Sequence, residues 1–237
     1  MNILISIATC VLIGYLFGCI NLSYLFSKVK GFDIRNFGSQ NAGASNVVIL
    51  MGKKTGAIVA ASDILKAYLA VKLSIWLFPE FFLAGSVAAS VVILGHIFPF
   101  YMGFRGGKGF ASLGGAVLAL DYRMFLVLFV VALFIALVTD YICFAPISIA
   151  LIFPTAYGFV NGSVPAAFIL YISSVFIWYR HMGNLKRIKN GRELKFSFLW
   201  NRKKEAERFG VSDDDGKDYP LYMDSQHAEE SDLHKTR

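Results

Sequence analysis

Charged residues are scarce in this sequence. Asp, Glu, Lys and Arg together make up 16% of its 237 residues, against roughly 25% in an average soluble domain. Hydrophobic residues make up 56%, and this excess excludes an ordinary soluble globular protein. Intrinsic disorder is excluded as well, because the low charge is accompanied by many large apolar side chains, including 22 Phe and 11 Tyr.

Cysteine is also sparse. The three cysteines, Cys10, Cys19 and Cys143, are odd in number, lie in apolar runs and lack the spacing of a metal or redox site. We therefore expect them to serve only in packing. No cluster of His, Asp or Glu has the spacing of metal ligands, so the sequence predicts no metal and no cofactor.

Long apolar runs bounded by charge, Gly and Pro predict an all-α, polytopic membrane protein of about seven transmembrane helices, because each run must cross about 30 Å of hydrocarbon. The fourth run is short for a full crossing. The first has no basic segment before it and no cleavage site, so we expect a retained helix. Gly14 and Gly18, four residues apart in this run, predict close approach of another helix. The predicted spans are residues 3–27, 55–78, 82–100, 109–120, 124–139, 141–160 and 163–180.

Basic residues are distributed unevenly along the chain. Residues 1–200 carry 16 Lys and Arg against 6 Asp and Glu, whereas residues 201–237 carry 7 against 10. If the amino terminus is outside, thirteen basic residues fall in the inner segments and only Arg123 in an outer turn, as the positive-inside rule favours. We expect an integral membrane domain, residues 1–200, and an acidic, disordered cytoplasmic tail, residues 201–237.

The first of three inner polar segments covers residues 32–54. It combines small residues, which let the backbone approach a ligand, with hydroxyl and amide groups that form hydrogen bonds. A flexible loop that caps the following helix is an equally good interpretation. The residues concerned are Gly38, Ser39, Asn41, Gly43, Ser45 and Asn46.

The second polar segment covers residues 95–115. Gly106, Gly107 and Gly109 surround Lys108 just before an apolar run, which predicts a nest of backbone amides and one cation that binds an anion such as phosphate. It is not a nucleotide P-loop, because Met102 and Gly109 stand where that motif needs Gly and Ser or Thr. The alternative is a basic loop at the membrane surface.

The third polar segment covers residues 179–193. At helical spacing His181, Asn184 and Ile188 share one face, while Lys186 points elsewhere. His181 is the one side chain here whose ordinary pKa allows proton transfer near neutral pH. The alternative is a juxtamembrane basic helix that binds anionic lipid headgroups.

Two charged residues lie inside the second predicted span. Asp63 and Lys66 are three residues apart and share a helix face. Because charge within a membrane is costly unless paired, a structural ion pair is favoured over direct catalysis. His96, at the inner end of the third span, is expected to be a hydrogen-bonded helix-end residue.

A ligand with a phosphate head and a lipid tail would suit three polar segments that lie beside a bilayer. The segments GSQNAGASNV with GKK (38–54), GHIFPFYMGFRGGKG (95–109) and HMGNLKRIKNGRE (181–193) resemble, in order and spacing, the signature segments of the bacterial acyl-phosphate:glycerol-3-phosphate acyltransferase family. The resemblance covers about residues 10–195. It implies a plasma-membrane enzyme of seven helices that transfers an acyl group from acyl phosphate to the 1-hydroxyl of glycerol 3-phosphate. This reaction, which gives lysophosphatidate, is the first step of phospholipid synthesis.

The same resemblance implies a set of site residues. It places Ser39, Asn41, Ser45 and Asn46 along the active site, gives a phosphate to Gly106, Gly107 and Lys108, and lets His181 and Asn184 position glycerol 3-phosphate, with Glu193 closing the third motif. One departure matters: Ile49 stands where the family usually has an Arg that is expected to help bind phosphate.

Chemistry alone suggests roles for these residues. Acyl phosphate is an activated anhydride, so the protein has to bind two anions, orient a hydroxyl and stabilise an oxyanion. We expect Lys108 and the glycine amides to take the leaving phosphate and Ser39 or Asn41 to donate to the oxyanion. The base is either His181 or a phosphate oxygen of the substrate.

Other functions are weighed against this one. Glycerolipid acyltransferases that use a His with an Asp five residues later are excluded, because Tyr101 and Lys186 stand at that distance from His96 and His181. Ile49 suggests a paralogue with another acceptor or without activity. A transporter or binding protein for a phosphate-bearing solute is a third possibility, although the sequence has neither internal repeats nor polar residues gathered at mid-membrane. No nucleic acid partner is expected.

Overall fold

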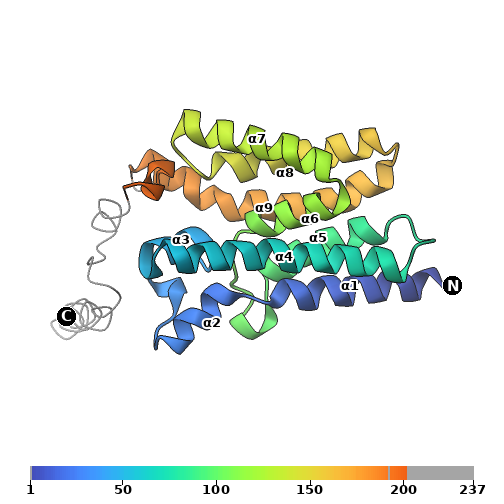
Figure 1. The fold of residues 1–237 in the computed structure, drawn as a ribbon, viewed down its shortest axis with the longest axis horizontal. Helices are drawn as coiled ribbons and strands as arrows, with labels where there is room; N and C mark the ends of the chain where they lie inside the picture. Colours follow the sequence, from blue (N-terminus) through green and yellow to red (C-terminus); the bar gives the residue numbers. More distant parts are fainter. Residues whose placement is uncertain (1, 192, 202–237) are drawn as a thin grey trace, which may run out of the picture.

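The chain folds into a bundle of long helices (Figure 1), seen in a computed structural model that describes residues 2–191 and 193–201. Within this described part the only β-type pairing is an isolated bridge between Tyr141 and Lys195, so the expected all-α class is confirmed. The predicted tail, from residue 202 onward, lies outside the described residues. The helices are α1 (Ile3–Cys19), α2 (Leu22–Val29), α3 (Ala44–Met51), α4 (Lys53–Leu77), α5 (Ala84–Ile97), α6 (Phe110–Leu120), α7 (Tyr122–Thr139), α8 (Phe144–Val160) and α9 (Val164–Lys189), with 3₁₀ turns η1 (Ile34–Asn36), η2 (Phe100–Met102) and η3 (Phe196–Leu199).

The first apolar run is not one helix, as the prediction of a span over 3–27 assumed. Helix α1 ends at Cys19 and α2 begins at Leu22 because Asn21 caps the second helix. Asn21 Oδ1 accepts a hydrogen bond from Tyr24 N at 2.9 Å, and its Nδ2 donates to the carbonyl of Ala42 at 3.2 Å. An amide that satisfies both a helix end and a distant carbonyl breaks the helix between Cys19 and Leu22.

The other apolar runs form helices close to their predicted bounds, but the structure differs from the prediction at α9 and in the first polar segment. Helix α9 continues to Lys189, past the predicted end at residue 180. The first polar segment contains the helix α3, in which Val47, Val48, Ile49 and Leu50 are all buried, so it is more than a flexible loop.

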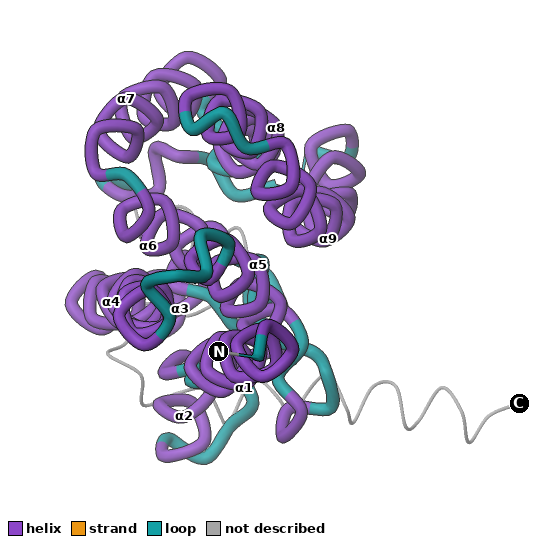
Figure 2. Tube along the Cα trace, turned by 90° about the vertical axis from the view of Figure 1, so that its right-hand side faces the viewer, coloured by secondary structure: helices purple, strands orange, loops and turns teal. Residues whose placement is uncertain are grey.

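Helix α5 lies at the centre of the bundle and contacts α1, α4, α6 and α9. It packs closely against α1, because a Cβ added to Gly18 would lie 2.3 Å from the carbonyl oxygen of Val92 and one added to Gly14 would lie 3.0 Å from that of Ala88. The predicted close approach at these two glycines is confirmed. Seen along the bundle, α1, α4 and α5 form one group and α7, α8 and α9 another, with α6 between them (Figure 2).

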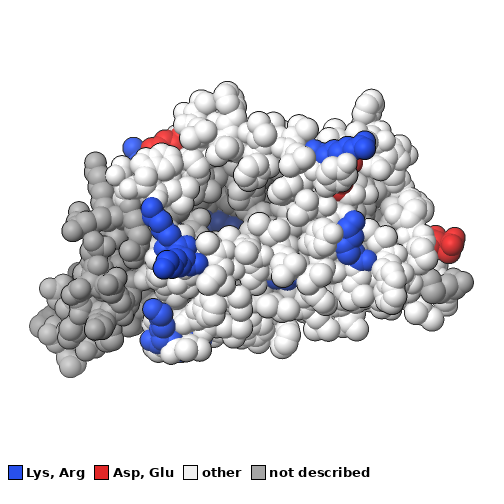
Figure 3. Space-filling view, in the orientation of Figure 1, with Lys and Arg blue, Asp and Glu red and all other residues white. Residues whose placement is uncertain are grey.

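The sides of the bundle are apolar and exposed. On α7, only Leu128 and Ala136 are buried, while Val130 and Phe134 are each 64% exposed. Lys and Arg gather at the two ends of the molecule, and the surface between them is almost free of charge (Figure 3). Such a surface requires hydrocarbon around it. Among the described residues, three helical stretches are long and apolar enough to cross a membrane by themselves, Ile3–Val29, Ala84–Met102 and Tyr122–Thr139; the total of seven spans stays a prediction.

Candidate active site

A chain of hydrogen bonds joins the second polar segment to the third. Lys108, in the loop between η2 and α6, donates from Nζ to Oδ1 of Asn184 on α9 at 2.7 Å. Asn184 Nδ2 in turn donates to Oε1 of Glu193 at 2.7 Å. Glu193 Oε2 accepts from Nε of Arg187 at 2.8 Å. Four side chains from two segments are therefore held in one polar cluster.

Helix α9 presents two of the predicted site residues on one face. His181 and Asn184 are buried, at 4% and 5% exposure, while Met182 and Lys186 are exposed, so the shared face is confirmed. His181 Nδ1 lies 2.7 Å from the carbonyl oxygen of Ile177. Because a carbonyl only accepts hydrogen bonds, we assign the ring proton to Nδ1, which leaves the lone pair on Nε2.

The glycine loop does not have the predicted form. Gly106 N donates to the carbonyl of Ile97 at 2.9 Å and Gly107 N to that of His96 at 3.1 Å. These two amides are therefore not directed at an anion, and the expected nest has to be corrected on this point. Glycine is needed at Gly106 because the backbone is crowded there: a Cβ on Gly106 would lie 2.2 Å from the His96 carbonyl oxygen. Substrate binding by the two glycines stays a prediction.

Lys108 is half-buried in this cluster, and burial, reinforced by the nearby Arg187 guanidinium, lowers its pKa to about 8. The ammonium is therefore retained at neutral pH. The loop is also fixed from α9, because Nη2 of Arg180 donates to the carbonyl of Gly106 at 3.0 Å. The residue after Lys108, Gly109, has a φ of +89° and precedes the first turn of α6, a conformation that favours glycine.

Asn46 organises the first polar segment from inside. It is fully buried, and its Nδ2 lies within 3.2 Å of the carbonyl oxygens of Ile34, Phe37 and Asn41. Its Oδ1 accepts from Ser39 N at 2.9 Å. The Asn46 amide therefore holds the loop in shape, and its predicted contact with substrate stays a prediction.

Ser39, Asn41 and Ser45 remain half-exposed on this loop. Asn41 Oδ1 is a buried acceptor with no hydrogen-bond partner in the described part of the chain. No hydrogen bond among the described residues joins these three side chains to Lys108, although the loop lies at the same end of the bundle as the start of α4 and the end of α9 (Figure 1). The molecule is hollowed near this end, between the lower and upper helices, with basic side chains inside the hollow (Figure 3).

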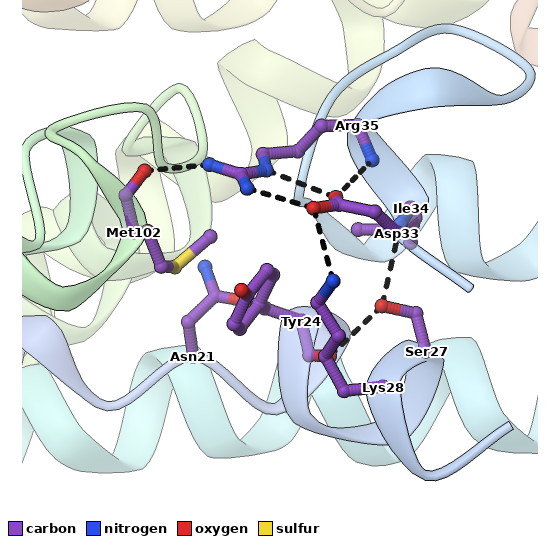
Figure 4. A network of polar contacts seen from close by, with 8 residues as sticks. All are labelled: Asn21, Tyr24, Ser27, Lys28, Asp33, Ile34, Arg35 and Met102. Carbon is purple, nitrogen blue, oxygen red and sulfur yellow. Dashed lines mark hydrogen bonds and ion pairs between the residues drawn. The ribbon is translucent and has the colours of Figure 1, made fainter. Parts of the chain in front are cut away.

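The first segment is tied to the second through Arg35 (Figure 4). Its guanidinium binds both carboxylate oxygens of Asp33, at 2.9 Å and 2.7 Å, and donates to the carbonyl of Met102 at 2.5 Å. The Arg35 hydrogen bonds, with Lys28 nearby, hold the pKa of Asp33 at about 2. This ion pair fixes the loop against η2, which leads into the glycine loop.

Ile49 is buried in an apolar cluster with Ile34, Val47 and Leu50. Its side chain therefore supplies packing and no charge to the site. The three cysteines are all buried and unpaired, as expected for packing residues. Cys143 lies within electrostatic range of Lys108 and Glu193.

The predicted Asp63–Lys66 ion pair is confirmed, with 2.7 Å between Oδ1 and Nζ. His96 hydrogen-bonds to the same pair near the end of α5.

Among the described residues no three His, Cys, Asp or Glu side chains form a group that could hold a metal ion. A cavity of about 590 Å³ lies at the other end of the bundle, where Lys72 and the turn 118–123 line it; it contains none of the predicted site residues.

Two arginines of this site escaped the sequence-based prediction. Arg187 lies three residues after Asn184, so helical spacing alone places it on the same face. Arg180 precedes His181. Arg180 Nε and Arg187 Nη2 are buried nitrogens without a hydrogen-bond partner in the described part of the chain. The site therefore holds cationic donors that an anion would satisfy.

Comparisons with known proteins show which family this chain belongs to. A family model described as glycerol-3-phosphate acyltransferase matches residues 8–191. Glycerol-3-phosphate acyltransferase 1 of Oceanobacillus iheyensis is 39% identical over 199 residues, covering 81% of this chain and 96% of its own. The corresponding protein of Aquifex aeolicus is 38% identical, covering 78% and 97%.

Two solved structures resemble the fold. Both are crystal structures of PlsY (YgiH), an integral membrane glycerol 3-phosphate acyltransferase. The glycerol 3-phosphate form has a TM-score of 0.75 and 34% identity, covering 83% of this chain and 98% of that one. The lysophosphatidic acid form has a TM-score of 0.72 and 33% identity, covering 82% and 97%.

Proposed function

The chain belongs to the glycerol-3-phosphate acyltransferase family, and from this premise we propose how its residues carry out the reaction. It is a bacterial plasma-membrane enzyme that transfers an acyl group from acyl phosphate to the 1-hydroxyl of glycerol 3-phosphate. The products are lysophosphatidate and phosphate. The hydroxyl oxygen forms a bond to the acyl carbon, the bond between that carbon and the phosphate oxygen breaks, and a base takes the hydroxyl proton.

One observation carries this function. The two crystallised relatives are named for glycerol 3-phosphate and for lysophosphatidic acid, which are the acceptor before and after acylation. This chain matches nearly the whole of both, and it places Lys108, Asn184 and Glu193 in one hydrogen-bonded cluster. The same scaffold therefore supports both the binding and the acylation of glycerol 3-phosphate.

In this proposal Lys108 is the principal ligand for the phosphate of glycerol 3-phosphate, rather than for the leaving phosphate of the donor. One of its three ammonium hydrogens is given to Asn184, so two remain for phosphate oxygens. Arg180 Nε and Arg187 Nη2 supply further donors. These cations serve in place of the Arg that the family usually carries at the position of Ile49, and hydrogen bonds between ions contribute about 1.5–3 kcal/mol each.

His181 is the candidate base. With Nδ1 bound to the Ile177 carbonyl, the Nε2 lone pair is available to accept the proton of the attacking hydroxyl. A correctly placed general base contributes about 10²–10⁴ in rate. The competing acceptor is a phosphate oxygen of the substrate itself, which needs no protein base.

The first segment supplies the remaining polar groups. Ser39 donates to the oxyanion that forms on the acyl carbonyl, and the partnerless Asn41 Oδ1 accepts from a glycerol hydroxyl. Ser45 lines the same loop, whose shape Asn46 maintains. Loss of one oxyanion donor costs about 10²–10³ in kcat.

The site faces the cytoplasm in this proposal, with the amino terminus outside. Supporting this orientation, the exposed Lys53 and Lys54 begin α4 at the same end as Lys108, and basic loops favour the cytoplasmic side. Residues 1–200 form the catalytic unit, and the acidic tail follows it in the cytoplasm.

The single-cysteine variants Lys53→Cys and Arg123→Cys test the orientation in intact cells. A membrane-impermeant maleimide should label only Arg123→Cys, because residue 123 is expected outside. Labelling of only Lys53→Cys would show that the orientation is the reverse of the one proposed.

The direct test uses purified protein in detergent with radiolabelled glycerol 3-phosphate. Palmitoyl phosphate as donor should give lysophosphatidate, while palmitoyl-CoA should give none, because the proposed donor is an acyl phosphate and the acyl group of the CoA thioester carries no leaving phosphate. A folded protein that makes no product from palmitoyl phosphate would instead be a family member without activity or with another acceptor, the alternative that Ile49 suggests.

The same assay separates the two candidate bases. His181→Ala should lower kcat by about 10²-fold or more at saturating substrate if Nε2 accepts the proton. Unchanged kcat would assign the proton to substrate phosphate. Tyr179→Ala is a matched control on the same helix, because its side chain is 67% exposed on the outer face.

Lys108 predicts a pH dependence of acceptor binding. Its pKa of about 8 means that the cation is present below that pH and is lost above it, so KM for glycerol 3-phosphate should rise about tenfold per pH unit at alkaline pH. The groups facing it are Arg187, Arg180, Glu193 and Cys143. Lys108→Arg keeps its charge throughout and should abolish the rise. A wild-type KM that is flat from about pH 7 to about pH 9.5 would contradict the assignment.

A further inference from the structure

Three ionisable side chains are buried outside the site described above. Asp63 and Lys66 on α4 and His96 on α5 are 3%, 4% and 3% exposed. Lys66 Nζ lies 2.7 Å from Asp63 Oδ1, 2.9 Å from His96 Nδ1 and 2.5 Å from the carbonyl oxygen of Ile20. All three ammonium hydrogens therefore have an acceptor, which a buried ammonium requires.

These contacts fix the state of the imidazole. The ammonium can only donate, so His96 Nδ1 accepts from Lys66. The contact of His96 Nδ1 with Asp63 Oδ1 is longer, at 3.3 Å, which agrees with this assignment. The ring proton is thereby assigned to Nε2, on the side of the ring that faces away from Lys66.

The other side of His96 supports the glycine loop. Its carbonyl accepts from Gly107 N at 3.1 Å, and a Cβ added to Gly107 would lie 2.1 Å from His96 Nε2. The imidazole thus packs directly against the backbone of the residue that precedes Lys108. Because the His96 ring is in contact with the backbone of Gly107, we expect a shift of this ring to move the glycine loop that carries Lys108.

The cluster also reaches the break between α1 and α2. Lys66 binds the carbonyl of Ile20, and Tyr101 Oη donates to the neighbouring carbonyl of Cys19 at 2.8 Å. Two backbone acceptors that a helix break exposes in an apolar bundle are satisfied in this way. The elements that meet here are the break, α4, α5 and the stretch 99–107.

We propose that Asp63, Lys66 and His96 form a positioning cluster that sets where Lys108 lies, and so determines the affinity for the phosphate of the acceptor. This inference rests on the proposed function. None of the three side chains touches substrate; they act through the ring of His96 on Gly107 and thus on Lys108. A misplacement of about 1 Å at a reacting group costs up to about 10² in rate.

The test compares His96→Asn with wild type. Asparagine Oδ1 takes the place of Nδ1 and keeps the bond to Lys66, but it removes the part of the ring that supports Gly107. We expect a roughly 10-fold to 100-fold rise in KM for glycerol 3-phosphate, with a shifted pH at which KM begins to rise and a melting temperature close to wild type. Ser90→Ala, buried on the same helix and outside the cluster, is the control and should change neither.

The pH readout separates positioning from simple stabilisation. A structural role would lower the melting temperature or the active fraction, and the surviving enzyme would keep the wild-type KM and pH break; that result would overturn the proposal. If His96→Asn does not fold, Asp63→Asn, which keeps the shape of the side chain and removes its charge, carries the same test. Wild-type turnover is measured in the same series, so an inactive wild type would refute the proposed function and an unchanged variant of an active enzyme would refute this inference alone.

Discussion

The hydrogen bond from Lys108 to Asn184 joins segments 76 residues apart, and the rest of the site is arranged around it. A half-buried ammonium needs acceptors, yet a carboxylate in direct contact would neutralise it and compete with substrate. A neutral amide solves this problem, because Asn184 orients Nζ without cancelling its charge. Glu193 stands one hydrogen bond further away, and Arg187 occupies its second oxygen. The charge on Lys108 thus stays available for an anion.

The same problem recurs wherever polar groups enter the apolar bundle. The loop at residues 34–41 is filled by a single buried amide, that of Asn46. The carbonyls exposed at the break after α1 are taken by Lys66 and Tyr101. Backbone that leaves regular helix inside a membrane protein has to find such partners. Polar side chains of this bundle therefore divide into those that hold backbone and those that face the site.

Features set by local spacing were predictable from the sequence. The close approach at Gly14 and Gly18, the shared face of His181 and Asn184 and the pairing of Asp63 with Lys66 all follow from helical periodicity. The resemblance to the family supplied the site residues as a set, beyond what periodicity shows.

Features that depend on distant partners were not predictable. The helix break at Asn21 depends on the carbonyl of Ala42. The amides of Gly106 and Gly107 turn to Ile97 and His96 rather than to an anion. Glycine content indicates a close backbone approach, but it does not tell whether a ligand or another part of the chain makes that approach.

The most direct test of the central claim, that Lys108 binds the phosphate of the acceptor, is a structure of this protein with glycerol 3-phosphate bound. The account predicts phosphate oxygens within hydrogen-bond distance of Lys108 Nζ, with its bond to Asn184 retained; a phosphate bound away from Lys108, such as beside Lys72 in the cavity at the other end, would contradict it.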